Sequence, residues 1–349
     1  MKYGHFLEEG AGTIGFVAPS FGCNIEPYHS AFKNSLEKWK KLNYEVKCGP
    51  NVYEGSGVGI SNTPKLCAKE FNEAYQDADS DVLISCGGGE LMCEILDYID
   101  FDALKKADAK WFMGYSDNTN LVFLLTTICD KAAIYGPCAP AFGMEPWHPS
   151  LSDAKAILTG QSHTSHGYDL WEKESLKTEE RPLTPYHVTE PKILHYYNRG
   201  NQETPGMKKA QMSGRLIGGC LDSLINLCGT KYDKVDEFIH KYEEDGIVWY
   251  LEACDLNPMS IRRALWQLKH AGWFRDAKGF LIGRPYCFGE EMFGVDQYNA
   301  VTSMLGDLNV PIIMDLDIGH LPPMMPLVCG SVAHVSANGD QIEIEMDYR

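Results

Sequence analysis

A serine, a glutamate and a histidine in this sequence each follow residues that predict the end of a buried strand. Ser116 comes after the apolar residues 111–114 and before Asp117, a residue type that often begins a helix. Glu252 ends a strongly apolar run, and His320 lies in a loop bounded by glycine and proline after another strand. In nucleophilic catalysis a base activates a hydroxyl, and a third group orients the base. The sequence offers all three groups on turns that follow strands.

The turn around Ser116 has the mechanical features of a nucleophile elbow. Gly114 permits a sharp bend because it has no Cβ, and the bend would expose the serine hydroxyl beside the N–H groups that begin a helix. Asn118 stands where the usual G-x-S-x-G pattern has its last glycine. A serine followed by an aspartate is also an ordinary helix cap, so this stretch alone leaves both interpretations open.

A second turn, with glycine at each of residues 87–89, follows a strand expected over 81–86 and precedes Glu90. Such a turn lets an anionic group approach the backbone closely. It could hold a phosphate, supply part of an oxyanion hole facing Ser116, or serve only as a tight turn. The G-x-G-x-x-G spacing and a Walker lysine are absent here, which weakens the phosphate interpretation.

The elements that must position these residues alternate between strand and helix. Strands are expected over residues 13–20, 44–48, 81–86, 111–114 and 132–137, and helices over 30–42, 64–77 and around 91–96. This alternation predicts an α/β fold with a doubly wound, mainly parallel sheet, whose sites form at the carboxyl ends of the strands.

The regular alternation breaks near residue 150, and residues 160–210 are polar and loop-like. An irregular stretch of this length is either functional or a linker, and its Trp171 could line a substrate pocket or stack on a ring. Residues 216–221 lead into a helix that is expected to end at Gly229, and further strands are expected over residues 246–251, 279–283 and 311–314, followed by a C-terminal β-hairpin. We therefore expect a domain over 1–155, a connecting or substrate-loop region over 156–212 and a second domain over 213–349.

Composition narrows the classes of function. A chain of 349 residues favours two domains, and its net charge of −17 argues against nucleic acid polymers and anionic membranes as partners. The sequence has no stretch of eighteen apolar residues and no apolar signal-peptide segment near Met1. Its twelve cysteines form no C-x-x-C pair, which excludes zinc-ribbon and thioredoxin-type motifs. A cytoplasmic protein with free thiols is the expectation.

Five segments resemble motifs of the LD-carboxypeptidase family of serine peptidases, also called muramoyltetrapeptide carboxypeptidases. They are residues 12–20 (GTIGFVAPS), 113–119 (MGYSDNT), 216–221 (LIGGCL), 251–252 (LE) and 319–320 (GH). The resemblance covers nearly the whole chain. It implies that Ser116 is the nucleophile, His320 the general base and then acid, and Glu252 the group that orients it. It also implies an oxyanion hole made by the backbone amide of Asp117 and one amide of the glycine turn, for which Gly88 is the candidate preferred over Gly87 and Gly89.

The same resemblance implies an architecture and an assembly. The family fold is a Rossmann-like N-terminal domain joined to a smaller, β-rich C-terminal domain. Ser116 would come from the first domain, and Glu252 and His320 from the second. The family also implies a homodimer. A serine-based mechanism of this kind needs neither a metal nor an organic cofactor.

Two departures from murein-directed members of the family bear on the substrate. Many of those members have Arg-Gly-Gly-Tyr-Gly at the glycine turn, where this chain has Cys-Gly-Gly-Gly-Glu over 86–90. They also commonly have phenylalanine before Gly-His, where this chain has Ile318. Together with the long stretch over 160–210, these features are similar to the branch that contains the microcin C self-immunity peptidases. Substrates in that branch are peptidyl or aminoacyl nucleotides with an acidic amino acid and an amide-type linkage.

This branch resemblance suggests which residues contact the substrate. Trp171 is the candidate to stack on the base, and the glycine turn adds Gly87, Gly89 and Glu90. An alternative is a murein LD-carboxypeptidase that removes the terminal D-alanine from a cytoplasmic tetrapeptide. An alternative of another class is a non-hydrolytic, Rossmann-like nucleotide-binding protein in which Ser116 only caps a helix.

Overall fold

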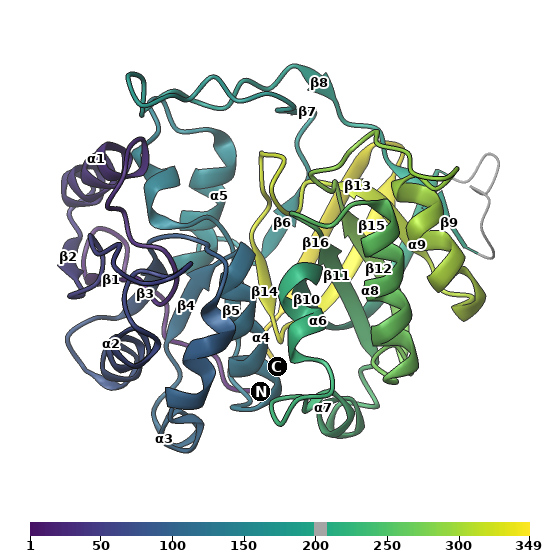
Figure 1. Ribbon diagram of the computed structural model, residues 1–349, viewed down its shortest axis with the longest axis horizontal. Helices are drawn as coiled ribbons and strands as arrows, with labels where there is room; N and C mark the ends of the chain where they lie inside the picture. Colours follow the sequence, from purple (N-terminus) through teal and green to yellow (C-terminus); the bar gives the residue numbers. More distant parts are fainter. Residues whose placement is uncertain (199–207) are drawn as a thin grey trace. The chain divides into compact units, whose positions relative to one another are not determined.

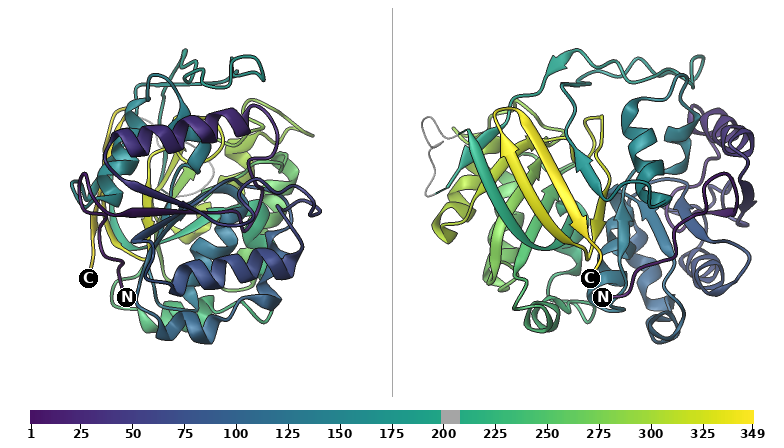
Figure 2. Two further views of the ribbon diagram at one scale, coloured as in Figure 1. Left: turned by 90° about the vertical axis from the view of Figure 1, so that its left-hand side faces the viewer. Right: turned by 180° about the vertical axis from the view of Figure 1, so that it is seen from behind.

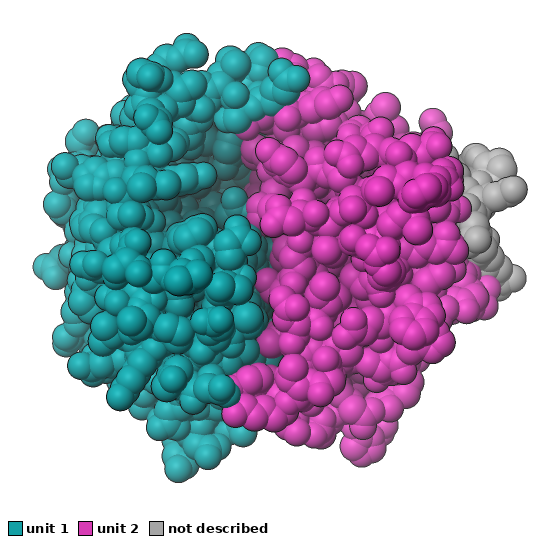
Figure 3. Space-filling model, viewed as in Figure 1, with its two compact units in different colours: residues 1–163, 174–187, 326–329 teal, residues 164–173, 188–325, 330–349 magenta. Residues whose placement is uncertain are grey.

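The chain forms two compact units in a computed structural model that describes residues 1–198 and 208–349. Unit 1 consists of residues 1–163, 174–187 and 326–329, and unit 2 of residues 164–173, 188–325 and 330–349, as coloured in Figure 3. Residues 156–212, expected as a connecting region, are shared between the two units, and residues 199–207 within them lie outside the described part. Each unit has its own sheet, which confirms the predicted α/β fold class with a separate, β-rich C-terminal sheet.

Unit 1 contains a six-stranded sheet in the order β14-β5-β4-β3-β1-β2. The strands are β1 (Thr13–Val17), β2 (Glu45–Cys48), β3 (Val82–Ser85), β4 (Trp111–Gly114), β5 (Ala133–Tyr135) and β14 (Leu327–Cys329). The first five are parallel, and β14 joins β5 in the antiparallel sense. The order 2-1-3-4-5 is that of flavodoxin-like doubly wound sheets, in which ligands bind beside the switch point between β1 and β3.

The helices of unit 1 lie on both faces of this sheet. They are α1 (Tyr28–Lys41), α2 (Pro64–Gln76), α3 (Phe101–Lys106), α4 (Thr119–Thr127), α5 (Pro149–Leu158) and the 3₁₀ helices η1 (Met92–Tyr98), η2 (Ser116–Asn118) and η3 (Ala139–Gly143). Figure 2, left, shows α1 on one side of the sheet and α2 and α3 on the other. Every residue of α4 is buried, as its apolar sequence requires. The helix expected around residues 91–96 is present as the 3₁₀ helix η1, which begins at Met92.

Unit 2 contains an eight-stranded sheet in the order β6-β16-β15-β10-β11-β12-β13-β9. The strands are β6 (Thr164–His166), β9 (His195–Tyr197), β10 (Lys209–Cys220), β11 (Ile247–Glu252), β12 (Ala277–Gly283), β13 (Ile312–Leu316), β15 (Val332–Asn338) and β16 (Gln341–Asp347). The central strands β10 to β13 are parallel, and the outer four pair antiparallel. A separate pair is formed by β7 (Leu170–Trp171) and β8 (Glu190–Pro191).

The helices of unit 2 lie on one face of its sheet. They are α6 (Leu221–Leu227), α7 (Val235–Lys241), α8 (Pro258–His270), α9 (Gln297–Leu305) and η4 (Gly306–Leu308). Figure 1 shows α6, α8 and α9 in front of the strands, whereas Figure 2, right, shows β10, β15 and β16 without helices over their far side. Buried and exposed residues accordingly alternate along β15 and β16. Among the described residues, no helix is both long and apolar enough to cross a lipid bilayer.

Candidate active site

Ser116 is the first residue of η2 and lies in a strained turn directly after β4. Its backbone φ is 59°, in the left-handed region that a residue with a Cβ rarely adopts. The preceding residue, Tyr115, is still extended, so the chain reverses sharply at the serine. The N–H of Ser116 donates to the hydroxyl of Tyr135 at 3.2 Å. A strained residue between a strand and a helix is the geometry that a nucleophile elbow requires.

Asn118, which stands at the position of the usual final glycine, joins the elbow to the glycine turn after β3. Its Nδ2 donates to the carbonyl oxygen of Gly87 at 2.7 Å and to that of Tyr115 at 3.0 Å. It also explains the glycine before the elbow, because a Cβ on Gly114 would lie 2.8 Å from the Asn118 Cγ. The sequence identified Asn118 only as a departure from the motif and gave no sign of this role.

Gly88 leaves space directly beside the hydroxyl of Ser116. A Cβ added at Gly88 would lie 2.9 Å from both Cβ and Oγ of Ser116 and 3.9 Å from the backbone nitrogen of Asp117. The carbonyl oxygen of Gly88 accepts from the N–H of Phe21 at 2.9 Å, whereas its own N–H has no acceptor among the described residues. An unpaired donor beside the serine is what an oxyanion hole needs.

The neighbouring residues of the turn have different surroundings. A Cβ on Gly89 would lie 2.1 Å from the hydroxyl oxygen of Ser20, so this glycine allows the loop after β1 to approach. Gly87 accepts hydrogen bonds through its carbonyl oxygen, including one from Ser85 at 3.1 Å. Glu90 is exposed, and its N–H donates to the carbonyl oxygen of Gly59 at 2.9 Å.

The side chain of Asp117 is buried and fixes the elbow to its surroundings. Its Oδ2 accepts from the Ser20 hydroxyl at 2.6 Å and from the Met92 N–H at 2.8 Å, and its Oδ1 accepts from Asn120 at 3.0 Å. Burial raises the pKa of this carboxyl to about 6, although these hydrogen bonds act in the opposite direction. The side chain therefore has a positioning role, and the predicted oxyanion contact concerns only the backbone N–H.

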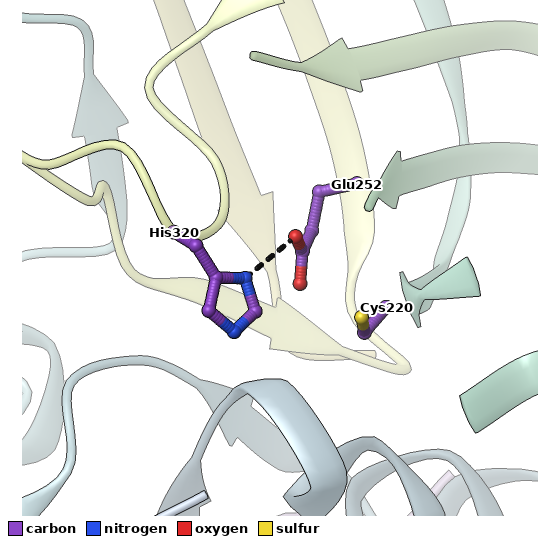
Figure 4. Close-up of side chains that lie close together, drawn as sticks. All are labelled: Cys220, Glu252 and His320. Carbon is purple, nitrogen blue, oxygen red and sulfur yellow. Dashed lines mark hydrogen bonds and ion pairs between the residues drawn. The ribbon is translucent and has the colours of Figure 1, made fainter. Parts of the chain in front are cut away.

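Unit 2 brings Glu252 and His320 together. Glu252 is the last residue of β11 and is 1% exposed, and its Oε2 lies 2.9 Å from Nδ1 of His320, as Figure 4 shows. The residue before the histidine, Gly319, has a φ of 105°, and a Cβ there would lie 2.6 Å from the same carboxylate oxygen. Glycine is therefore needed at 319 both for its backbone conformation and for the close approach of the loop.

The pKa of His320 reflects two opposing influences. Burial lowers it, whereas the charge of Glu252 and hydrogen bonds with Cys254 and Glu252 raise it, and the net result lies well above the usual range. The pair therefore stabilises the imidazolium form. A carboxylate that orients a histidine and stabilises its protonated form is the arrangement that serine hydrolases use.

Cys220 completes the surroundings of Glu252. The two residues are partners in the β10–β11 register, and the Cys220 thiol donates to Oδ2 of Asp222 at 3.2 Å. Asp222 also accepts from the backbone N–H groups of Cys254 at 3.0 Å and Asp255 at 2.9 Å. Sequence reasoning assigned no role to Cys220 or Asp222, because only the strand register places them beside the glutamate.

Trp171 packs inside unit 2. It is 4% exposed, its ring centroid lies 5.0 Å from that of Phe288, and the guanidinium of Arg284 lies 5.0 Å from its ring. Its Nε1 donates to the carbonyl oxygen of Pro191 at 3.2 Å. These are the contacts of a loop anchor, and stacking of Trp171 on a base stays a prediction.

Comparison with known proteins gives matches over both units. A family model described as the LD-carboxypeptidase N-terminal domain matches residues 14–136, and one described as the LD-carboxypeptidase C-terminal domain matches residues 213–335. The microcin C7 self-immunity protein MccF of Escherichia coli is 27% identical in an alignment of 345 positions that covers 96% of this chain and 94% of that protein.

Solved structures show the same fold. A MccF-like protein from Bacillus anthracis superposes with a TM-score of 0.81 at 20% identity and covers 100% of both chains. MccF in complex with aspartyl sulfamoyl adenosine superposes with a TM-score of 0.78 at 22% identity, covering 99% of this chain and 98% of that one.

Proposed function

This chain belongs to the LD-carboxypeptidase family of serine hydrolases, and from that premise we propose that it cleaves an amide-type bond in a small aminoacyl-nucleotide conjugate. The proposed catalytic groups are Ser116, His320 and Glu252. The observation that carries the proposal is the hydrogen bond of 2.9 Å between the buried Glu252 carboxylate and His320. A carboxylate buried at the end of an apolar strand is costly unless it has such a partner.

In the proposed mechanism Ser116 Oγ attacks the acyl carbonyl and passes its proton to Nε2 of His320. Glu252 holds the other ring nitrogen as N–H and stabilises the imidazolium that forms. The N–H groups of Asp117 and Gly88 stabilise the oxyanion. The imidazolium then protonates the departing nitrogen, and water, activated by His320, hydrolyses the acyl-serine. One water molecule is consumed, and the products are the free carboxylic acid and the protonated nitrogen leaving group, which is a sulfamate when the substrate is aspartyl sulfamoyl adenosine.

An acidic aminoacyl nucleotide is the proposed substrate class because solved structures of MccF contain aspartyl sulfamoyl adenosine and glutamyl sulfamoyl guanosine. The second candidate is removal of D-alanine from a murein tetrapeptide, which the description of the family favours. The turn over 86–90 lacks the arginine and tyrosine of many murein-directed members, and this favours the nucleotide substrate. Membership of a hydrolase family weighs against the non-hydrolytic alternative.

The test is hydrolysis of aspartyl sulfamoyl adenosine and a murein LD-tetrapeptide side by side, with products identified by mass spectrometry. We expect Ser116→Ala and His320→Ala each to lower kcat/KM by roughly 10⁴-fold or more with little loss of stability. Ser35→Ala and His240→Ala are matched controls, a buried serine and an exposed histidine that should leave the rate unchanged.

Three outcomes separate the hypotheses. Full activity of Ser116→Ala would show that Ser116 is not the nucleophile. Micromolar nucleotide binding by Ser116→Ala, with no products from the parent protein, would favour the non-hydrolytic alternative. Cleavage of the tetrapeptide alone would identify a murein carboxypeptidase. We also propose that the protein is a homodimer in solution and that its hydrolysis needs no metal, so that treatment with a chelator does not lower the rate.

A further inference from the structure

A thiol, a carboxylate and an imidazole converge at the carboxyl ends of the parallel strands of unit 2. Cys220 ends β10, Glu252 ends β11, and His320 lies in the loop after β13. One ligand atom from each lies within 4.8 Å of the other two, and Figure 4 shows the three side chains facing a common space. The proposed hydrolysis uses Glu252 and His320 but has no role for the thiol of Cys220.

These three groups are the ligands that Zn²⁺ takes in proteins. A tetrahedral zinc ion with one sulfur and two lighter ligands holds its ligand atoms about 3.5 Å apart. Since the ligand atoms lie within 4.8 Å of one another, the cluster needs to contract by no more than about 1.3 Å to enclose the ion. A fourth position would remain for water. The Cys220 thiol donates a hydrogen bond to Oδ2 of Asp222 at 3.2 Å, and two backbone N–H groups also donate to this carboxylate. Asp222 would therefore remain as a fixed negative charge behind the metal site.

We propose that Cys220, Glu252 and His320 form a site for a thiophilic divalent cation of the Zn²⁺ class, and that the bound cation inhibits the hydrolase. Binding exchanges one dication for two protons, one from the Cys220 thiol and one from the imidazolium of His320. The binding step is independent of the proposed function, whereas the inhibition rests on it.

Inhibition follows whichever nitrogen of His320 binds the cation. Coordination by Nε2 occupies the lone pair that would accept the serine proton. Coordination by Nδ1 replaces the hydrogen bond to Glu252, and the imidazole loses its orientation and the carboxylate that stabilises its charge. The cation thus makes the catalytic base unavailable without any change in unit 1.

The test begins with Co²⁺ as a spectroscopic probe on chelator-treated full-length protein. We expect one equivalent to give a thiolate-to-metal absorption band in the near ultraviolet and the visible bands of tetrahedral cobalt, and Zn²⁺ to displace it. Cys220→Ser should abolish the thiolate band and weaken Zn²⁺ binding by at least 10- to 100-fold, roughly the range found for loss of a supporting group. Cys228→Ser, at a thiol elsewhere in unit 2, is the matched control and should bind like the parent.

His320→Ala removes a second ligand and serves as the test in case Cys220→Ser misfolds. This variant should still give a thiolate band, but it should bind Co²⁺ more weakly than the parent. Absence of the band in the parent, or an unchanged band in Cys220→Ser, would contradict the proposed metal site.

Inhibition is tested with aspartyl sulfamoyl adenosine as substrate. Zn²⁺ should inhibit the parent reversibly, and Cys220→Ser should be inhibited at least 10-fold less relative to its own uninhibited rate. Cobalt binding and hydrolysis by the parent protein separate the two proposals, because a thiolate band in a parent protein that hydrolyses neither test substrate would support the metal site and remove the proposed function.

Discussion

The turn around Ser116 and the Glu252–His320 pair are positioned by different physical means. At Ser116 the backbone is decisive, with a φ of 59° and a glycine, Gly88, whose missing side chain leaves room for the hydroxyl. At the pair, charge is decisive, because a buried carboxylate bonds an imidazole and raises its pKa. We therefore expect the first region to be sensitive to added volume and the second to a change of charge at constant volume.

Among the changes that distinguish the two regions, Glu252→Gln should have the largest effect, because it changes the charge and keeps the volume of the side chain. We expect kcat/KM to fall by roughly 10³-fold, because the amide neither fixes the imidazole tautomer nor stabilises the imidazolium. The pH profile should also move. In the parent kcat/KM rises with pH as His320 loses its proton, with a midpoint above the ordinary value of about 6.5.

Glu252→Gln should shift this midpoint to lower pH, because the burial that lowers the pKa of His320 remains while the charge that raises it is gone. The other titratable neighbours, Cys254 and Cys220, are present in both proteins, and the profiles are to be measured with a chelator. Glu70→Gln is the matched control, a buried carboxylate bonded to the N–H groups of Ala18 and Asn51. An unchanged rate and midpoint in Glu252→Gln would remove Glu252 from the mechanism.

The two regions also differ in how far the sequence could predict them. The bend at Ser116 depends on neighbours within a few residues, so glycine, serine and the following helix predicted a bend there, although they left open whether Ser116 only caps the helix. The role of Asn118 was not predictable, because its partner Gly87 lies 31 residues away across the sheet. When two residues come into contact only because their strands are neighbours in the sheet, no pattern in the nearby sequence predicts that contact.

The Glu252–His320 contact joins residues 68 positions apart, and periodicity alone could not pair them. The family resemblance suggested the pair, and the strand register then placed Cys220 beside it. The stretch over 160–210 was expected to be loop-like, yet its described residues include the strands β6, β7, β8 and β9. These strands have only two or three residues each, too few to show an alternation of apolar and polar side chains.

A smaller effect should come from added volume at the elbow. Gly88→Ala places a Cβ 2.9 Å from the Ser116 hydroxyl, and we expect kcat to fall by about 10²-fold as the oxyanion donor moves. The pH midpoint should stay where it is in the parent, because the charges around His320 do not change. Gly87→Ala is the matched control in the same turn, where the nearest atom, a carbonyl oxygen of Phe21, lies 3.2 Å away. Equal rates for the two variants would mean that space at Gly88 does not matter.

The smallest effect should come from Ser20→Ala, which removes the hydroxyl that donates to Asp117 at 2.6 Å. The pKa of Asp117 is raised to about 6 in the folded protein, so the free energy of unfolding falls as the pH rises from about 4 through 6 and the buried carboxyl ionises.

The Ser20 hydroxyl stabilises the ionised form of Asp117 most, so we expect its loss to cost about 1–2 kcal/mol at pH 8 and less at pH 5, measured by urea unfolding. Ser35→Ala is the control, because the buried hydroxyl of Ser35 has no hydrogen-bond partner among the described residues and its removal should cost nothing at either pH. An equal loss at both pH values would show that Ser20 contributes packing alone, and that the region around Ser116 is held without any contribution from charge.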